Sequence, residues 1–429
     1  MKFLLTAINA KFIHSNPAIY SLRAGVGEKL QPYVELAEFT INESLESILE
    51  GIWKRQPKVI GFSCYIWNWK LIREILTELP KILPDTEIWL GGPEVTYDGP
   101  GLLREFPQVT GIMVGEGEVT FREVLEQYLR EAETAGQSEQ QPESDSTEHQ
   151  VADRRGTVAG KSMVERFGQI PGLCLASGYT APRDLTDLTT LPSLYEDMEP
   201  FTNRIIYYET SRGCPYRCSY CLSSIDKSVR FRDLKLVLPE LDFFLEKRVP
   251  QVKFVDRTFN AKKSHAMAIW KHILEHDNGV TNFHFEITAD LLDEEELDLI
   301  SRMRPGLIQL EIGVQSTNTE TIRAIRRKMD LKRLRYVVER INAGKNVHQH
   351  LDLIAGLPFE DYDSFGRSFN DVYSMEPEQF QLGFLKVLKG SYMHEKVPDY
   401  DLQYRGKAPY EVLSTKWLPY SDVLRLKGV

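Results

Sequence analysis

The sequence predicts an α/β protein with a doubly wound, Rossmann-like parallel sheet at its N-terminus and a partial (β/α)6, TIM-like barrel after it. Short apolar runs alternate with amphipathic stretches over residues 1–130, and the same alternation returns over residues 201–395. Strands that alternate with helices form parallel sheets, because a parallel pair needs a long crossover connection. Residues 131–168 are rich in Glu, Gln, Ser, Thr and Ala, so we expect a break between two domains there.

The first domain, residues 1–130, is predicted to contain five strands and three helices. The strands are expected at residues 3–8, 34–39, 59–63, 87–90 and 111–114, and the helices at residues 44–55, 69–79 and 121–130. Ligands of doubly wound sheets bind beyond the carboxyl ends of the strands, so we expect any ligand of this domain at that edge.

The stretch that follows divides into two parts. Residues 131–168 cannot bury enough apolar surface to offset the entropy lost on ordering, so we expect a disordered acidic linker or insertion without a chemical role. Residues 169–200 are expected to connect this linker to the second domain.

The second domain, residues 201–395, is predicted to contain six strands separated by helices. The strands are expected at residues 205–209, 252–256, 283–287, 308–314, 348–354 and 379–385, and helices at residues such as 294–303 and 331–343. Fully packed parallel strands read as continuous apolar runs, but these strands alternate. Phe283 and Phe285, for example, share one face, and His284 and Glu286 share the other. If the apolar faces meet the helices, the polar faces line a ligand-sized cavity. An antiparallel sheet with one face in water is the alternative, which the intervening helices disfavour.

Composition narrows the class of function. The formal net charge of -10 argues against a general nucleic-acid-binding face, which needs basic residues. No run of about 18 apolar residues is present, so no membrane span is expected. The apolar N-terminus is too short for a signal peptide. The five cysteines do not resemble a disulfide framework and fit a reducing cytoplasm.

Three of the five cysteines, Cys214, Cys218 and Cys221, lie in one short segment with the spacing C-x3-C-x2-C. Three thiolates on one loop can hold a cubic [4Fe-4S] cluster by three of its four irons, which leaves the fourth iron open to a small molecule. A zinc site is the alternative. Zinc usually takes four ligands in paired groups, and the sequence has no second pair.

Residues 200–395 as a whole resemble the core of the radical S-adenosylmethionine (SAM) enzymes, and the three cysteines match that family's cluster ligands. The resemblance implies that Tyr220, in the aromatic position before the last cysteine, packs near the adenine of SAM. Asp256 stands where relatives carry a Gly-Gly-Glu-like turn for the methionine amino group, although this sequence departs from that turn. The resemblance also implies SAM contacts for four further residues: Gln315 and Ser316 near the sugar, and Gly356 and Leu357 near the adenine.

Residues 1–130 resemble the cobalamin-binding domain that precedes the radical SAM core in one large subclass. Three loops carry the resemblance, and glycines in them let the backbone approach a flat macrocycle. The residues implied are Ser63, Cys64 and Tyr65 after the third strand, Gly91, Gly92, Pro93 and Glu94 after the fourth, and Gly115, Glu116 and Gly117 after the fifth. A doubly wound domain whose glycines only make turns is the alternative. The Asp-x-His-x-x-Gly motif is absent, so we expect no histidine ligand below cobalt. Cys64 either approaches the corrin or is a small buried residue.

Within that subclass the chain resembles an uncharacterised group whose members usually carry a further C-terminal domain of unknown function. Residues 396–429 are therefore expected to be a C-terminal extension and the start of such a domain. An incomplete domain would leave the cavity uncapped, so whether full activity needs the rest is left open.

The resemblance implies an enzyme that cleaves SAM reductively at the cluster and uses the 5′-deoxyadenosyl radical. Methyl transfer to an unactivated carbon of a polar substrate, with cobalamin as cofactor, is the leading interpretation. The candidates for substrate contact or proton handling are Glu286, Glu311, His350 and Asp352, for which a supporting hydrogen-bonding role is the alternative. The expected partners are a small-molecule or peptide substrate and an electron donor such as flavodoxin or ferredoxin.

Three other interpretations stay open from the sequence. Cobalamin assists cyclisation or rearrangement in some relatives. A methylthiotransferase would carry a second cysteine triad near its N-terminus, but only Cys64 lies in the first domain. The last is a cobalamin-binding sensor with a vestigial cluster loop.

Overall fold

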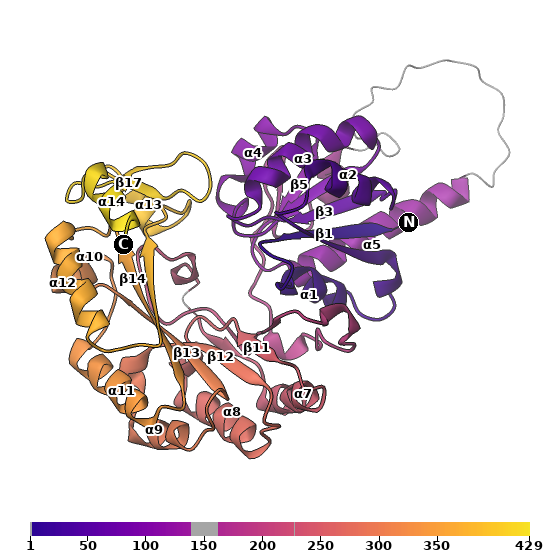
Figure 1. Cartoon of the computed structure of the whole chain (residues 1–429). Helices are drawn as coiled ribbons and strands as arrows, with labels where there is room; N and C mark the ends of the chain where they lie inside the picture. The colour runs from indigo at the N-terminus through magenta and orange to yellow at the C-terminus, as the bar shows by residue number, and fades with distance from the viewer. Residues whose placement is uncertain (1, 139–161, 227) are drawn as a thin grey trace, which may run out of the picture. The chain divides into compact units, whose positions relative to one another are not determined.

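The computed structural model describes residues 2–138, 162–226 and 228–429 of the chain (Figure 1). The chain forms two compact units, Met1–Glu196 (unit 1) and Asp197–Val429 (unit 2), each described here by itself.

Unit 1 is a doubly wound sheet, as the sequence predicts. Its strands lie in the order β2-β1-β3-β4-β5-β6-β7, with β1 to β5 parallel and the last two antiparallel. The strands are β1 (Phe3–Asn9), β2 (Val34–Thr40), β3 (Val59–Ser63), β4 (Glu87–Gly91), β5 (Val109–Met113), β6 (Leu173–Leu175) and β7 (Gly178–Tyr179). The helices are α1 (Pro17–Gly25), α2 (Leu45–Trp53), α3 (Trp69–Ile82), α4 (Gly99–Glu105), α5 (Gly117–Ser138) and α6 (Met163–Phe167).

Two apolar cores cover the two faces of this sheet. Ile48, Ile72 and Leu102 from α2, α3 and α4 pack into one core. Ile19 and Phe121, from α1 and α5, pack into the other. Because both faces are covered, the central strands are buried on both sides, which is typical of parallel sheets.

The boundaries of unit 1 differ from the predicted ones. Helix α5 continues to Ser138, and α6 and strands β6 and β7 also belong to this unit, which ends at Glu196. Apolar residues within a polar stretch explain the difference: Phe167, Leu173 and Leu175 are buried in the unit 1 core. The middle of the predicted linker, residues 139–161, lies outside the described residues.

Arg166 fixes α6 to the sheet domain. Its guanidinium lies 3.0 Å from a carboxylate oxygen of Glu87 and 2.9 Å from one of Glu131, and its side chain is 1% exposed. Replacing one partner of a buried ion pair leaves the other charge uncompensated.

We expect Arg166→Ala to lower the free energy of unfolding of unit 1 by about 3–5 kcal/mol. Arg130→Ala is the control, because Arg130 is exposed and its guanidinium bonds to Gln127 on its own helix. The control is expected to change stability by no more than about 0.5 kcal/mol. Denaturant titration with hydrogen exchange of peptides from β4 and α5 measures both. Equal effects of the two variants would contradict a stabilising role for α6.

Unit 2 contains the predicted six-stranded partial barrel. The six strands of the barrel are all parallel and lie in the order β15-β14-β13-β12-β11-β8. The strands are β8 (Ile206–Tyr208), β11 (Gln251–Phe254), β12 (Asn282–Ile287), β13 (Ile308–Gln315), β14 (His348–Ala355) and β15 (Gln379–Phe384). The helices between them are α7 (Leu234–Glu246), α8 (Lys263–Glu275), α9 (Glu294–Ser301), α10 (Thr319–Ala324), α11 (Leu331–Gly344) and α12 (Tyr362–Tyr373).

Two smaller parts complete unit 2. The hairpin of β9 (Ser211–Arg212) and β10 (Arg230–Phe231) lies between β8 and α7 in the chain. After β15 follow α13 (Tyr392–Glu395), β16 (Gln403–Tyr404), β17 (Val412–Ser414) and α14 (Tyr420–Lys427).

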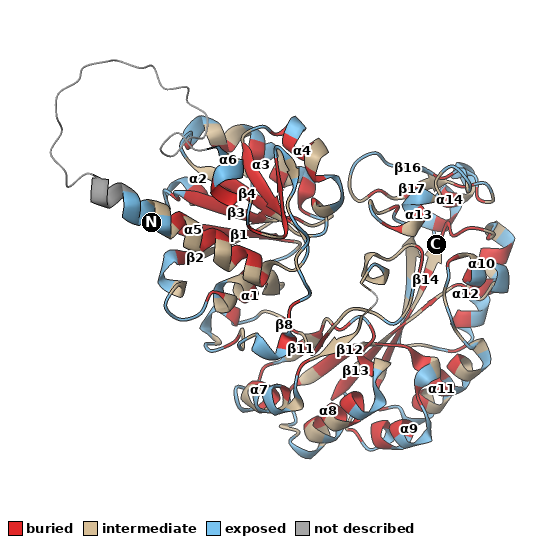
Figure 2. Ribbon diagram, turned by 180° about the vertical axis from the view of Figure 1, so that it is seen from behind, coloured by how far each residue is buried: buried red, intermediate tan, exposed pale blue. Residues whose placement is uncertain are grey.

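The alternation in the barrel strands is confirmed by burial (Figure 2). Along β13, each apolar residue is buried and each residue between them is partly exposed. The polar faces therefore line the inside of the barrel, and the apolar faces pack against the helices.

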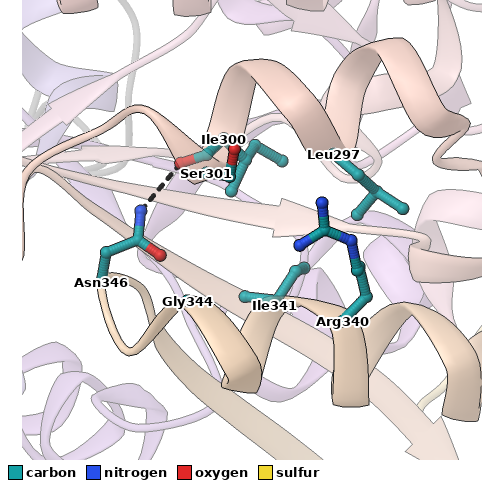
Figure 3. Close-up of a pocket in the computed structure, with 7 residues that line it drawn as sticks. All are labelled: Leu297, Ile300, Ser301, Arg340, Ile341, Gly344 and Asn346. Atoms are coloured by element: carbon teal, nitrogen blue, oxygen red, sulfur yellow. Dashed lines mark hydrogen bonds between the residues drawn. The ribbon is translucent and has the colours of Figure 1, made fainter.

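A pocket between α9 and α11 does not belong to this interior (Figure 3). The amide nitrogen of Asn346 donates to the carbonyl oxygens of Ile300 and Met303, at 2.8 and 2.9 Å. These bonds tie the segment after α11 to the end of α9. Across the part of the chain that the structure describes, no helix is both long and apolar enough to span a membrane.

Candidate functional site

The cysteine loop, residues 213–221, begins at the β9–β10 hairpin, where Arg212 pairs with Arg230. Gly213 has φ +92°, and a Cβ on it would lie 1.7 Å from the carbonyl oxygen of Ser228. Only glycine fits this position, because the backbone at Ser228, just before β10, approaches Gly213 so closely. The fold therefore closes the loop at its base.

Two of the three loop cysteines are joined by a backbone hydrogen bond, and the third contacts Thr258. The amide of Cys221 donates to the carbonyl oxygen of Cys218 at 3.1 Å. Cys218 is buried, and Cys214 and Cys221 are partly exposed. The Sγ of Cys214 lies 3.6 Å from the hydroxyl of Thr258.

A partly buried arginine lies beside the cysteine loop. The Nη1 of Arg327 is 3.8 Å from the Sγ of Cys218, and its Nη2 donates to the carbonyl oxygen of Gly313. Burial raises the pKa of the Cys218 thiol, and the Arg327 charge opposes that rise. Arg327 was missed from the sequence, because an Arg-Arg-Lys run after a helix is usually a solvated surface.

These donors fit a [4Fe-4S] cluster. The described part of unit 2 supplies three thiols on one loop and, beside Cys218, the partly buried positive charge of Arg327 to balance thiolates. The other cysteines, Cys64 and Cys174, are buried in the core of unit 1. Three soft thiolate ligands suit an iron–sulfur cluster with one iron left without a protein ligand.

The end of β13 holds the two residues implied for the SAM sugar. Gln315 has φ +73°, and its buried Oε1 has no hydrogen-bond partner among the described residues, so it can accept a bond from a ligand. Ser316 is fully buried and donates to Glu360 at 2.7 Å. Ser368 donates to the same oxygen at 2.8 Å, and burial raises the pKa of Glu360 to about 7. The Ser316 hydroxyl is therefore occupied by Glu360, which favours a positioning role over the expected ligand contact.

Asp256 also differs from its expected role. Its carboxylate is 1% exposed and accepts bonds from the Thr210 amide at 2.9 Å, the Thr210 hydroxyl at 2.7 Å and the Ser211 hydroxyl at 2.6 Å. Both oxygens are occupied, so the structure favours a role in holding the start of the β9–β10 hairpin. A direct bond to a methionine amino group would require these contacts to open.

The turn after β14 is shaped by a glycine. Gly356 has φ +87°, which L-residues rarely adopt. Leu357 is fully buried in an apolar cluster that also contains Tyr220. The side chains of Leu357 and Tyr220 thus form an apolar wall, and a ligand can meet the Gly356–Leu357 turn only through its backbone.

The four predicted catalytic candidates come together inside the barrel. In the strand register, Glu286 of β12 lies beside Glu311 of β13, and Glu311 lies beside His350 of β14. The Nε2 of His350 lies 3.0 Å from the Oδ1 of Asp352. Sequence analysis missed Lys253, which lies 3.1 Å from Glu311. It also named His284 without a role, although its Nε2 lies 2.9 Å from the same carboxylate.

The pKa values of this cluster diverge. The hydrogen bond from His284 lowers the pKa of Glu311 to about 2, and burial raises the pKa of Glu286 to about 7. Contact with Asp352 raises the pKa of His350. Adjacent groups with separated pKa values can hold and release a proton near neutral pH.

In unit 1, the three predicted loops lie side by side at one edge of the sheet. Ser63 pairs with Gly91, and Gly91 pairs with Met113, so the ends of β3, β4 and β5 are in register. Gly92 has φ +110°, and a Cβ there would lie 2.5 Å from the carbonyl oxygen of Cys64. Gly115 has φ +83°, with no heavy atom within 4 Å of the position of a Cβ. The edge therefore offers tight backbone turns with open space, which fits a large planar cofactor.

The other residues predicted in these three loops differ in burial and in hydrogen bonding. The Cys64 thiol is fully buried in the core, so the structure favours the small buried residue over contact with the corrin. Pro93 is exposed beside the Gly92 turn. Glu94 donates its amide to Cys64 at 3.4 Å. Glu116 accepts a bond from the Thr186 amide at 2.7 Å, which ties the loop to the segment after β7.

The loop after β3 also presents an aromatic pair. The rings of Tyr65 and Trp67 stack at 4.3 Å with an interplanar angle of 8°, and Trp67 is 44% exposed. Asn68 holds this loop by donating to the carbonyl oxygens of Ile8 and Ser63. Trp67 was missed from the sequence, because an aromatic residue just before a helix is normally read as core.

Three family models match the chain. The B12 binding domain matches residues 4–125, and the radical SAM superfamily matches residues 208–372. A protein family of unknown function, DUF4080, matches residues 398–429.

The chain thus contains a B12-binding domain followed by a radical SAM domain.

Curated relatives of this B12-binding radical SAM protein include two methyltransferases. It is 26% identical over 83% of its length to the cobalamin-dependent radical SAM methyltransferase TokK of Streptomyces tokunonensis. It is 27% identical over 75% of its length to the 2-(S-pantetheinyl)-carbapenam-3-carboxylate methyltransferase of Streptantibioticus cattleyicolor. The chain spans about half the length of these relatives, 51% and 45%.

A solved structure confirms the fold. The radical SAM methyltransferase TsrM from Kitasatospora setae, with cobalamin and a [4Fe-4S] cluster bound, superposes with a TM-score of 0.70 at 16% identity. The match covers 99% of this chain and 91% of TsrM. The expected cofactors, a [4Fe-4S] cluster, SAM and cobalamin, are thus those of the two matched domains.

Proposed function

We propose that this B12-binding radical SAM protein is a cobalamin-dependent methyltransferase that acts on a carbon atom of a small polar substrate. The observation that supports this most is the presence in one chain of a three-thiol loop and a doubly wound domain whose open glycine turns lie at one edge. The names of the two curated relatives favour methyl transfer over cyclisation, rearrangement or a sensor role.

The bound cofactors would supply reductive cleavage of SAM and a transferable methyl group. The protein would position them and exclude water. Cys214, Cys218 and Cys221 would hold the cluster, and Arg327 would balance its charge from within the protein. The polar strand faces would orient the substrate, with the Glu311 carboxylate fixed by His284 and Lys253. Glu286 would hold a proton near neutral pH.

We infer that the protein works in the cytoplasm with an electron donor such as flavodoxin or ferredoxin. The described residues contain no membrane-spanning helix, and free cysteines with an iron–sulfur cluster need a reducing compartment.

Anaerobic reconstitution with iron, sulfide and hydroxocobalamin tests the proposal. The protein is then given SAM with a deuterated methyl group, a reductant and fractions of a metabolite extract. Mass spectrometry should find 5′-deoxyadenosine together with a product that carries the labelled methyl group. A protein that forms 5′-deoxyadenosine but transfers no label to any fraction would overturn methyl transfer. A protein that takes up no cobalamin would overturn the cobalamin assignment.

Glu286 predicts a pH dependence of stability. Its pKa is raised from the model-compound value of 4.5 to about 7, so it ionises in the unfolded chain before it does so in the folded one. Below pH 4.5 the carboxyl is neutral in both states. As the pH rises from 4.5 to above 7, the wild type should lose up to about 3 kcal/mol of stability relative to Glu286→Gln.

Glu311→Gln is the matched control with the opposite sign. The pKa of Glu311 is lowered to about 2, so its contribution to stability is present above pH 4.5 and is lost as the pH falls toward 2. Denaturant titrations of both variants and the wild type across pH 3–8 measure the two trends. A stability difference for Glu286→Gln that does not change with pH would contradict a neutral buried carboxyl.

A further inference from the structure

After β15 the chain returns to the ends of the barrel strands. We call residues 385–429 the C-terminal segment. It lies beyond residue 372, where the radical SAM match ends, and it includes residues 398–429, which match the family of unknown function. In Figure 1 this segment, drawn in yellow, lies at the end of β14.

The C-terminal segment holds the cysteine loop through Ser219, which lies between Cys218 and Cys221. The amide of Ser219 donates to the carbonyl oxygen of Ile325 at 2.9 Å. The carbonyl oxygen of Ser219 accepts a bond from the amide of Met393 at 2.7 Å. Ser219 is 1% exposed, so both bonds are shielded from water. The backbone between two of the three thiols is thus held from both sides.

Side chains strengthen the same contact. Met393 is fully buried in one apolar cluster with Ile325, and Tyr220 of the cysteine loop packs against this cluster. The guanidinium of Arg326 lies 3.3 Å from the centre of the Tyr392 ring, a cation–π contact. Helix α13 and the residues after α10 therefore contact each other, and both also bond to the cysteine loop.

The C-terminal segment also packs on the Gly356 turn. Residues 385–387 pair with residues 410–412, with the amide of Val412 donating to Leu385 at 2.9 Å and the amide of Val387 donating to Tyr410 at 3.0 Å. This pairing places Val412 so close that a Cβ on Gly356 would lie 2.7 Å from its Cγ1. One segment thus contacts both the cysteine loop and the turn after β14.

We propose that the C-terminal segment is a structural part of the cofactor site, which retains the cluster by preventing the cysteine loop from opening. Met393, which lies in α13 just before the stretch that matches DUF4080, is then the main positioning residue of the loop. The statement that the loop retains a cluster rests on the proposed function, but the statement that the segment keeps the loop closed does not. A metal site on a loop needs such support, because loop opening releases the ligands together.

Met393→Ala in the full chain tests the proposal, with Met303→Ala as the matched control. Both methionines are at most 3% exposed in unit 2, so both changes create a buried cavity. Met303 precedes β13 and lies at the amino end of that strand. The Met393 side chain instead belongs to the apolar cluster against which Tyr220 of the cysteine loop packs, and alanine removes this packing while the backbone bond to Ser219 stays. The first readout is the rate at which iodoacetamide alkylates Cys218 in the cluster-free protein, followed by mass spectrometry. The second is the rate at which a chelator removes iron after reconstitution.

We expect Met393→Ala to raise both rates about tenfold and Met303→Ala to leave both within about twofold of the wild type, since tenfold is 1.4 kcal/mol of loop opening. If Met393→Ala does not fold, Tyr392→Leu, which removes the ring contacts with Arg326 and Lys396, should raise both rates about threefold. Rates for the Met393 and Tyr392 variants equal to those of the control would overturn the proposal. A wild type that incorporates no iron, while alkylation still separates the variants, would overturn the proposed function but not the closed loop.

Discussion

Replacing Cys218 by serine is expected to abolish cluster assembly and SAM cleavage. Cys218 is the buried member of the three loop cysteines and lies beside Arg327. Serine keeps the shape but offers a hard oxygen that stays protonated at neutral pH, and iron–sulfur clusters require soft thiolates. Because two ligands cannot hold a cubic cluster with one open iron, the loss should exceed the roughly hundredfold effect of removing a supporting group alone.

Cys174→Ser is the matched control for this change. Cys174 is also buried, but it lies in the core of unit 1, where its thiol has no ligand role. The control should lower stability and leave the iron content of the protein unchanged. Iron and sulfide analysis, with formation of 5′-deoxyadenosine under reduction, measures both variants. A Cys218→Ser protein that retains the iron content of the wild type would contradict the assignment of the loop.

Replacing Gly115 by valine is expected to weaken cobalamin binding about 10- to 100-fold, which is about 1.4–2.8 kcal/mol. Gly115 has φ +83° and open space around the position of a Cβ, at the edge where β3, β4 and β5 end. A valine side chain would fill that space and block the approach of a macrocycle to the backbone. The left-handed conformation adds a cost in stability.

Gly27→Val separates these two effects. Gly27 has φ +79°, also without a heavy atom within 4 Å of a Cβ, but it lies between α1 and β2, at the opposite edge of the sheet. Both variants should lose similar stability, and only Gly115→Val should lose affinity. Titration of the full chain with hydroxocobalamin, followed by the corrin absorbance, measures the difference. Equal affinities of the two variants would place the cofactor elsewhere.

The regular elements of both sheets could be predicted because their signal is local. The strand at 59–63 has the predicted bounds, and the six barrel strands lie within a few residues of the predicted ones. A period of two along a strand fixes which face is apolar, so Glu286, Glu311 and His350 could be placed inside the barrel before their distances were known. The cluster could also be predicted from a local signal, the spacing of the three cysteines.

The roles of individual polar side chains could not be predicted in this way. Asp256 and Ser316 have the residue types and places of ligand contacts, but their partners Thr210 and Glu360 are 46 and 44 residues away in the chain. Arg327 approaches Cys218 from 109 residues away. A hydrogen bond at such a separation depends on how elements pack, and no local pattern records it.

Taken alone, the sequence determined the two α/β folds, the polar interior of the barrel, the three-thiol loop and the glycine turns. Each of these depends on side-chain periodicity, ligand count or backbone freedom within a short stretch. Only the tertiary structure decided that α6 docks on unit 1 through Arg166 and that Met393 holds the cysteine loop. Those contacts join segments far apart in sequence, so they exist only once the chain has packed and water has been excluded from them.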